Sequence, residues 1–163
     1  MKDEDAPALH ALVARNKAYL MKTLSWLDYD STTVEHTAGF IAHLNEAFLK
    51  TSFVLGIRRD NNELIGTVGF NSIDWDAKEA VVGYWLDEEM QGKGIVTESC
   101  RVLVGLGFND LQLNKINISC GTTNLKSQAI PKRLGFEEEK IVKDAEWLYD
   151  HYVDFVVFSK FNK

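Results

Sequence analysis

Residues 83–98 decide the fold: they read Gly-Tyr-Trp-Leu-Asp-Glu-Glu-Met-Gln-Gly-Lys-Gly-Ile-Val-Thr-Glu. The stretch 79–86 is rich in branched and aromatic residues, which predicts a β-strand. The glycines at 92 and 94 then lead into a helical segment that runs to about Phe108. A strand that passes through such a loop into a helix presents backbone N–H groups at the positive helix end, where a pyrophosphate can bind. The alternative is a glycine-rich turn with a structural role only.

This loop matches neither of the two common phosphate-binding patterns. A Walker A loop needs GxxxxGK followed by Ser or Thr, which is absent, and Thr97 occupies the third glycine position of a dinucleotide-binding fingerprint. Lys93 could add a positive charge to the loop.

The flanking segments complete a mixed pattern of helices and strands. Apolar spacing predicts a helix over 6–24, and a capping box of Thr32 and Glu35 predicts the start of a second helix. The second helix has an apolar stripe of Val34, Ala38, Ile41, Leu44 and Phe48. Further strands are expected over 52–58, 64–73, 115–120, 137–142 and 152–158, with a short helix over 124–134. This order predicts one mixed α/β domain, residues 1–163, around a central sheet.

Composition limits the classes of protein. The chain has 163 residues, 45% of them hydrophobic, and a net charge of −6, which argues against broad binding to nucleic acid. Its apolar runs are far shorter than the ~18 residues that a membrane span requires. The two cysteines, Cys100 and Cys120, and the four histidines form no metal-binding pattern, so we expect no metal and a reduced, cytoplasmic protein.

Two motifs resemble those of one enzyme superfamily. Gln91-Gly92-Lys93-Gly94-Ile95-Val96 looks like the acetyl-CoA loop of the GNAT N-acetyltransferases, and the flanking residues are typical of their RimJ/RimL branch. Asn124-x-x-Ser127 followed by Lys132-Arg133-Leu134-Gly135-Phe136 resembles the second signature of that branch. The resemblance runs in order from about Ala6 to the C-terminus.

The resemblance implies a GNAT-like fold with acetyl-CoA as co-substrate. The expected fold is a mostly antiparallel sheet of six to seven strands with about four helices, splayed into a V at the acetyl-CoA site. The pantetheine arm would pair with the backbone of Trp85 and Leu86, and Asn124 would steady it from the other wall. The pyrophosphate would bind the backbone amides of Gln91, Gly92, Lys93, Gly94, Ile95 and Val96.

The resemblance also implies a catalytic pair. In ribosomal-protein acetyltransferases of this branch, the serine of N-x-x-S contacts the cofactor sulfur and a glutamate nineteen residues later acts as base, which here correspond to Ser127 and Glu146. An amine must lose a proton before it attacks a thioester, and a carboxylate can accept that proton. The alternatives are a helix-start serine and an exposed loop carboxylate. Pro131 removes the N–H that would pair with the carbonyl of Ser127, and this change could aim the serine or only kink the helix.

The expected activity is acetyl transfer, in a ternary complex, to a protein N-terminal α-amine of the ribosomal-protein type. A small amine, such as a polyamine or amino-sugar, and a non-catalytic acyl-CoA-binding module remain open. Trp26, with Asp28 and Asp30, is a candidate acceptor wall, and core packing is its alternative. Only Met1–Asp5 precede the first helix, where the family usually has a strand, so either that strand is missing or a partner supplies the edge. A homodimer is a separate expectation.

Overall fold

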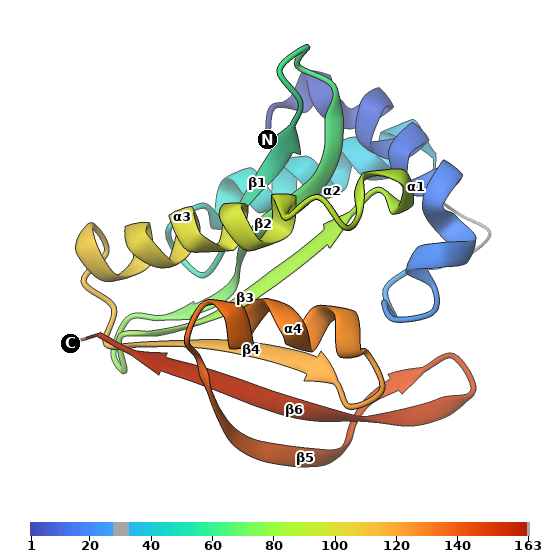
Figure 1. Ribbon diagram of the computed structural model, residues 1–163. Helices are drawn as coiled ribbons and strands as arrows, with labels where there is room; N and C mark the ends of the chain where they lie inside the picture. Colours follow the sequence, from blue (N-terminus) through green and yellow to red (C-terminus); the bar gives the residue numbers. More distant parts are fainter. Residues whose placement is uncertain (28–32, 163) are drawn as a thin grey trace.

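Six strands form one sheet in the order β1-β2-β3-β4-β6-β5 in the computed structural model, which describes residues 1–27 and 33–162 (Figure 1). Neighbouring strands are antiparallel except for β3 and β4, which are parallel. The strands are β1 (Phe53–Arg58), β2 (Leu64–Asp74), β3 (Glu79–Leu86), β4 (Lys115–Gly121), β5 (Glu137–Leu148) and β6 (His151–Phe161). The expected mixed α/β fold with a mostly antiparallel sheet is confirmed.

Four α-helices cover the sheet on two faces. They are α1 (Ala6–Leu20), α2 (Val34–Ala47), α3 (Ile95–Asn109) and α4 (Leu125–Arg133), with 3-10 turns η1 (Asp3–Asp5) and η2 (Glu88–Met90). Adjacent residues of β2 separate the faces, because Leu64 packs with Leu9 and Ile41 whereas Ile65 belongs to the larger cluster with α3. The first half of β2 is therefore buried on both sides.

The larger core lies between the sheet and helices α3 and α4. Its fully buried side chains include Phe70, Ile116, Ile118 and Phe158, together with Cys100 of α3. Along β4 every second residue is buried: Ile116, Ile118 and Cys120 face the helices, as the period of two in a strand requires. The core therefore fixes β4 and α3 relative to each other.

The predicted end of the first helix and the predicted start of the second helix both need correction. Helix α1 ends at Leu20 rather than at residue 24, because the amides of Lys22 and Thr23 bond carbonyls only three residues back. The N-cap of α2 is Thr33, whose hydroxyl accepts a hydrogen bond from the His36 amide. The helix therefore begins one residue later than the predicted capping box, and Thr32 itself lies outside the described residues.

The predicted apolar stripe of α2 is mostly not buried. Ile41 is fully buried and Ala38 packs partly against the smaller cluster, but Val34 and Phe48 are exposed. The helix lies against the edge of the sheet at β1, so only one turn of its apolar face meets the core. Phe48 instead packs against Phe53 of β1, with ring centroids 4.9 Å apart and ring planes tilted by 47°.

The C-terminal hairpin is longer than the sequence predicts. The strand β5 continues to Leu148 through register shifts after Glu138 and Val142, and Asp144 has a positive φ of 49°. Asp154 of β6 holds this bulge, because its carboxylate accepts from the amide of Asp144 and pairs with Lys143. The bulge interrupts the alternation of side chains, which is why the sequence predicts an end of the strand at residue 142. Because β5 in fact continues to Leu148, Glu146 lies on a strand and not in a loop.

The parallel pair β3–β4 is joined along only part of its length. Pairing runs from Glu79 with Lys115 to Val82 with Ile118, and beyond these residues the two strands diverge, as Figure 1 shows. On its other side β3 stays paired with β2 as far as Leu86, and β4 stays paired with β6 as far as Gly121. The sheet is therefore split into a V, as expected.

The contact of α3 with the sheet generates a matched pair of stability predictions. A Cβ at Gly107 would lie 2.8 Å from Ile116 Cδ1 and 2.9 Å from Phe70 Cζ, two side chains with no exposed surface. We expect Gly107→Ala to lower the free energy of unfolding by about 1–3 kcal/mol through overpacking. Gly105→Ala, two residues earlier in the same helix, would place its Cβ 4.0 Å from Asn109 Nδ2, an ordinary contact, and should raise it by up to ~1 kcal/mol. Urea denaturation measures both, and a stabilised Gly107→Ala variant would contradict the close packing.

Candidate active site

The loop between β3 and α3 leaves the start of the helix open. Gly92 and Gly94 have positive φ angles of 73° and 77°, and no described atom lies within 4 Å of a Cβ built on either residue. Gly94 is the N-cap of α3 and has no side chain to accept from the first helical amides. These amides need another acceptor, and an anion at the helix N-terminus provides one.

The first helix holds this loop in place. Arg15 of α1 donates to the Asp87 carboxylate, through Nε at 3.1 Å and through Nη2, and the Asn16 side-chain oxygen accepts from the Glu88 amide at 2.9 Å. Asp87 is 4% exposed. Burial alone would raise the pKa of Asp87, but the hydrogen bonds from Arg15 and the Glu89 amide outweigh burial and lower it. The carboxylate is therefore ionised at neutral pH and ties the loop to α1.

Gln91 connects the two sides of the opening. Its amide nitrogen donates to the Tyr19 hydroxyl of α1, and its oxygen accepts from Lys126 Nζ of α4 at 3.4 Å. Lys93 is exposed and its Nζ donates to the Glu89 carbonyl at 3.2 Å. The predicted anion-binding residues thus lie in one loop and the first turn of α3. Lys93 belongs to this set, and Lys126 lies beside it.

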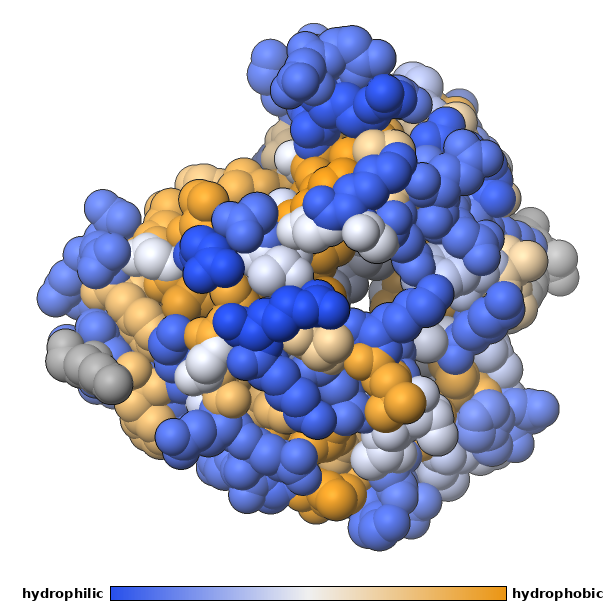
Figure 2. Space-filling model, viewed as in Figure 1, coloured by the Kyte–Doolittle hydropathy of each residue, from blue (hydrophilic) through white to orange (hydrophobic). Residues whose placement is uncertain are grey.

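The split between the strands presents the main chain of β3. Trp85 and Leu86 lie beyond the last residue pair with β4. The Trp85 side chain packs against the smaller cluster with α1, whereas Leu86 belongs to the larger core. The two side chains thus point to opposite faces of the sheet, and the backbone of this stretch of β3 forms the edge of the split. Figure 2 shows the surface hollowed between α4 and the upper part of the molecule.

Ser127 lies at the first turn of α4 and faces both walls of the split. Its amide donates to the side-chain oxygen of Asn124, the N-cap of the helix, at 3.2 Å. Its Oγ lies 3.0 Å from Tyr84 Oη of β3 and 3.2 Å from Cys120 Sγ of β4. Ser127 is therefore not a serine that bonds only within its own helix turn.

Both cysteines are buried and protonated at neutral pH. Burial raises the pKa of the Cys100 thiol to about 12 and raises the pKa of the Cys120 thiol. A nucleophilic cysteine reacts as its thiolate, and this form is disfavoured at both positions.

Glu146 lies on β5, close to the tip of the C-terminal hairpin. It pairs with Val153 across β5 and β6, and its Oε1 accepts from Ser25 Oγ at 2.7 Å. The hydroxyl of Tyr149, three residues on, donates to the Leu24 carbonyl at 2.5 Å. The segment after α1 is therefore fixed against the end of the hairpin, and the half-buried Glu146 carboxylate lies at that junction.

Trp26 lies in the same segment and is 53% exposed, which contradicts the alternative of core packing. The neighbouring Leu27 takes the buried position instead. Asp28 and Asp30 lie outside the described residues.

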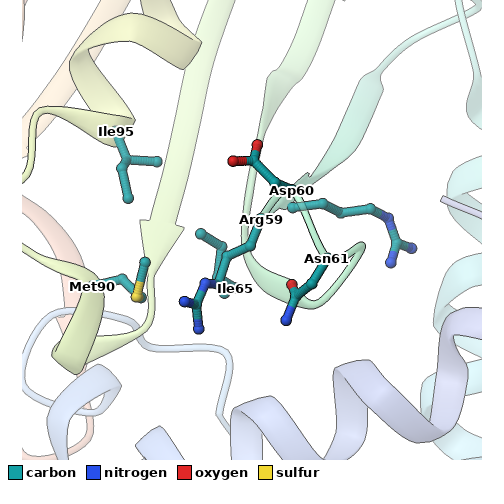
Figure 3. Close-up of a pocket in the computed structure, with 7 residues that line it drawn as sticks. Arg59, Asp60, Asn61, Ile65, Met90 and Ile95 are labelled. Carbon is teal, nitrogen blue, oxygen red and sulfur yellow. The ribbon is translucent and has the colours of Figure 1, made fainter.

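A separate pocket lies beside the glycine loop (Figure 3). It is lined by Ile65 of β2, Met90 and Ile95 near the start of α3, and Arg58, Arg59, Asp60 and Asn61 at the β1–β2 turn. It borders the loop on the β2 side, whereas the split opens between β3 and β4. Of the residues predicted to bind the cofactor or to act in catalysis, Ile95 alone lines this pocket.

Within the two described ranges, no group of three His, Cys, Asp or Glu side chains could hold a metal ion. Nor does any helix there have the length and apolar character to cross a membrane.

Several contacts of the site were not predicted from the sequence. Tyr84 and Cys120 flank Ser127, and Ser25 bonds Glu146. Tyr84 lies 43 residues from Ser127 in the chain, and Ser25 lies 121 residues from Glu146. One local signal was available for Ser127. Pro131 stands four residues later and leaves its carbonyl without the usual helical donor.

A split parallel strand pair, next to an uncapped helix that begins after a glycine loop, is the arrangement that the resemblance to the GNAT acetyltransferases implies. The chain belongs to the GNAT acetyltransferases: the model of the Acetyltransferase (GNAT) domain matches residues 1–137. It is an N-acetyltransferase, and solved structures that it resembles contain acetyl-CoA or coenzyme A.

Similar proteins match nearly the whole chain. The ribosomal-protein-serine acetyltransferase of Escherichia coli (strain K12) is 30% identical over 155 residues, which are 93% of this chain and 84% of that protein. The putative ribosomal N-acetyltransferase YdaF of Bacillus subtilis (strain 168) is 28% identical over 98% of this chain and 87% of its own length. The structure of the ribosomal L7/L12 α-N-protein acetyltransferase RimL with coenzyme A aligns with a TM-score of 0.93 at 31% identity, over 99% and 91% of the two chains.

The open helix end predicts a loss of acetyl-CoA affinity on filling Gly94. A valine side chain there would occupy the space next to the first amides of α3, so we expect Gly94→Val to weaken acetyl-CoA binding by roughly 10-fold or more. Gly135→Val is the control, because Gly135 has a similar φ of 72° at the far end of α4 and carries the same backbone strain. Calorimetry should find near-normal affinity in the control. Equal affinity in both variants would exclude the loop as the pyrophosphate site.

Proposed function

We propose that this acetyltransferase acts on the N-terminal α-amine of a protein, of the ribosomal-protein type, by direct transfer in a ternary complex. The observation that carries the proposal is the location of the two predicted catalytic groups. Ser127 lies inside the split, and Glu146 lies at the junction of the C-terminal hairpin with the segment after α1. The names of the Escherichia coli relative and of the RimL structure support a ribosomal protein as acceptor. Such an acceptor is in keeping with a cytoplasmic protein.

Acetyl-CoA supplies the activated acetyl group as a thioester. In this proposal the backbone of Trp85 and Leu86 pairs with the pantetheine arm, since this stretch of β3 has lost its β4 partner. The amides of Gln91, Gly92, Lys93, Gly94, Ile95 and Val96 bind the pyrophosphate at the positive end of α3. Asn124 lines the other wall while its side chain caps α4.

Glu146 is the proposed base. A protein α-amine has a pKa of ~8 and is mostly protonated at neutral pH, so a proton must leave before the nitrogen can attack. The Glu146 carboxylate can take that proton directly or through one water, and the hydrogen bond from Ser25 fixes its orientation.

Ser127 is the proposed hydrogen-bond donor to the departing thiolate. Its hydroxyl is held in the split by contacts from both strands, and a positioned donor stabilises negative charge as it develops. Direct transfer is favoured over an acetyl-cysteine intermediate because the Cys120 thiol, 3.2 Å from Ser127 Oγ, is kept protonated by burial.

One observation supports a small acceptor instead. The microcin C7 self-immunity acetyltransferase MccE, whose structure contains acetyl-CoA and AMP, aligns with a TM-score of 0.90 at 29% identity over 98% of this chain and 88% of that one. A protein about as similar to this chain as RimL is thus described in complex with a nucleotide as well as with acetyl-CoA. A small molecule is therefore the second candidate acceptor.

A thiol-release assay with an acceptor panel tests the proposal. The panel holds peptides with free Ser or Ala N-termini, the same peptides N-acetylated, free lysine, a polyamine and an amino-sugar. We expect the free-N-terminal peptides to give the highest kcat/KM and their acetylated forms to be inert. A small amine as the best acceptor would overturn the proposal. Binding of acetyl-CoA without thiol release from any acceptor would indicate a non-catalytic module.

Replacement of Glu146 by Gln tests its role as base. The variant keeps the shape and the acceptor for Ser25 but cannot take a proton, so we expect kcat/KM to fall roughly 10²–10⁴-fold at neutral pH. The loss should shrink as pH rises above the amine pKa of ~8, because the acceptor is then already neutral. Glu138→Gln, an exposed position on the same strand, is the control. A pH–rate profile of Glu146→Gln that superimposes on the wild type would exclude it as base.

A further inference from the structure

Helix α4 contains a carbonyl that its own helix cannot satisfy. In an α-helix the N–H of each residue donates to the carbonyl four residues earlier, and proline has no N–H. Pro131 stands four residues after Ser127 inside α4. The Ser127 carbonyl, next to the proposed catalytic hydroxyl, therefore needs a donor from elsewhere, since an unpaired buried carbonyl is costly.

Tyr84 of β3 supplies that donor from across the split. Its hydroxyl donates to the Ser127 carbonyl at 3.2 Å, and the same oxygen lies 3.0 Å from Ser127 Oγ. The Tyr84 ring packs against the larger core and its phenol is partly buried. Burial raises the pKa of the Tyr84 phenol, so the hydroxyl keeps its proton throughout the neutral range.

Both contacts of Tyr84 Oη can be hydrogen bonds at the same time in only one arrangement of the protons. A phenol has one proton, and a carbonyl oxygen can only accept. With the Tyr84 proton on the Ser127 carbonyl, the contact with Oγ is made by the serine hydroxyl donating to Tyr84 Oη. Ser127 thus holds its own proton and can turn it from Tyr84 toward another acceptor in the split.

We propose that Tyr84 is a positioning residue for Ser127: it replaces the helical donor that Pro131 removes, and so fixes the first turn of α4 with the serine hydroxyl in the split. This inference rests on the proposed function of Ser127 as donor to the departing thiolate. In that step no covalent bond to Ser127 forms or breaks. Its hydrogen bond moves from Tyr84 Oη to the sulfur, while the Tyr84 bond to the carbonyl stays in place.

A double-mutant cycle with Pro131 tests the assignment. Tyr84→Phe keeps the ring and removes the donor, and we expect kcat to fall roughly 10–100-fold, the range for one lost positioned donor, with acetyl-CoA affinity nearly unchanged. Pro131→Ala restores the backbone N–H that can donate to the Ser127 carbonyl. In that background, Tyr84→Phe should cost less than about 3-fold, because the carbonyl has regained a donor.

Equal losses of kcat in the two backgrounds would show that Tyr84 does not act through the Ser127 carbonyl. A Tyr84→Phe variant with wild-type kcat would also overturn the proposal. Tyr152→Phe is the matched control, because Tyr152 is 59% exposed on β6. Any effect of this substitution on kcat should be the same in the wild-type and Pro131→Ala backgrounds.

Thermal unfolding of the wild type, Tyr84→Phe, Pro131→Ala and the double variant tests the proposal without an activity measurement. Leaving the carbonyl unpaired should lower the Tm of Tyr84→Phe by about 2–8 °C, and the Pro131→Ala background should remove most of that shift. Additive Tm shifts would overturn the proposal. If the wild type acetylates no amine, the proposed function fails, yet the Tm cycle still reports whether Tyr84 holds Ser127.

Discussion

The short parallel contact between β3 and β4 is the constraint on which the rest of the structure depends. Four residue pairs, from Glu79–Lys115 to Val82–Ile118, join the two halves of the sheet. Each half is held on its outer side by an antiparallel partner, β2 or β6, so β3 and β4 each stay paired after they part. The opening is therefore a property of the whole sheet, and α3 and α4 lie on either side of it because each follows one of the diverging strands.

Most of the fold could be predicted from the sequence because its signals are local. The strand over 79–86 has the bounds that its composition predicts, and the glycines after it mark the start of α3. The predictions that were wrong depended on tertiary contacts. The apolar stripe of α2 lies mostly in solvent because the helix covers a sheet edge, and β5 passes Val142 because Asp154 holds the bulge from the neighbouring strand.

The candidate site divides in the same way. The glycine loop, Asn124 and Ser127 could be located by motif, since each lies at a helix start with its own sequence signal. The groups that orient them come from distant parts of the chain, such as Arg15 for the loop, Ser25 for Glu146 and Tyr84 for Ser127. Spacing within one segment carries no information on such pairs, except where Pro131 leaves a carbonyl that some other residue must serve.

The alternation of β3 beyond the last pair with β4 has a consequence for how such a protein can change over evolution. Trp85 points its side chain toward α1 and Leu86 toward α3, so the edge between them offers only peptide groups. Peptide groups are the same whatever the side chain. Substitutions at Trp85 can thus reshape the surface beneath the N-terminal helices while the strand edge keeps its chemistry.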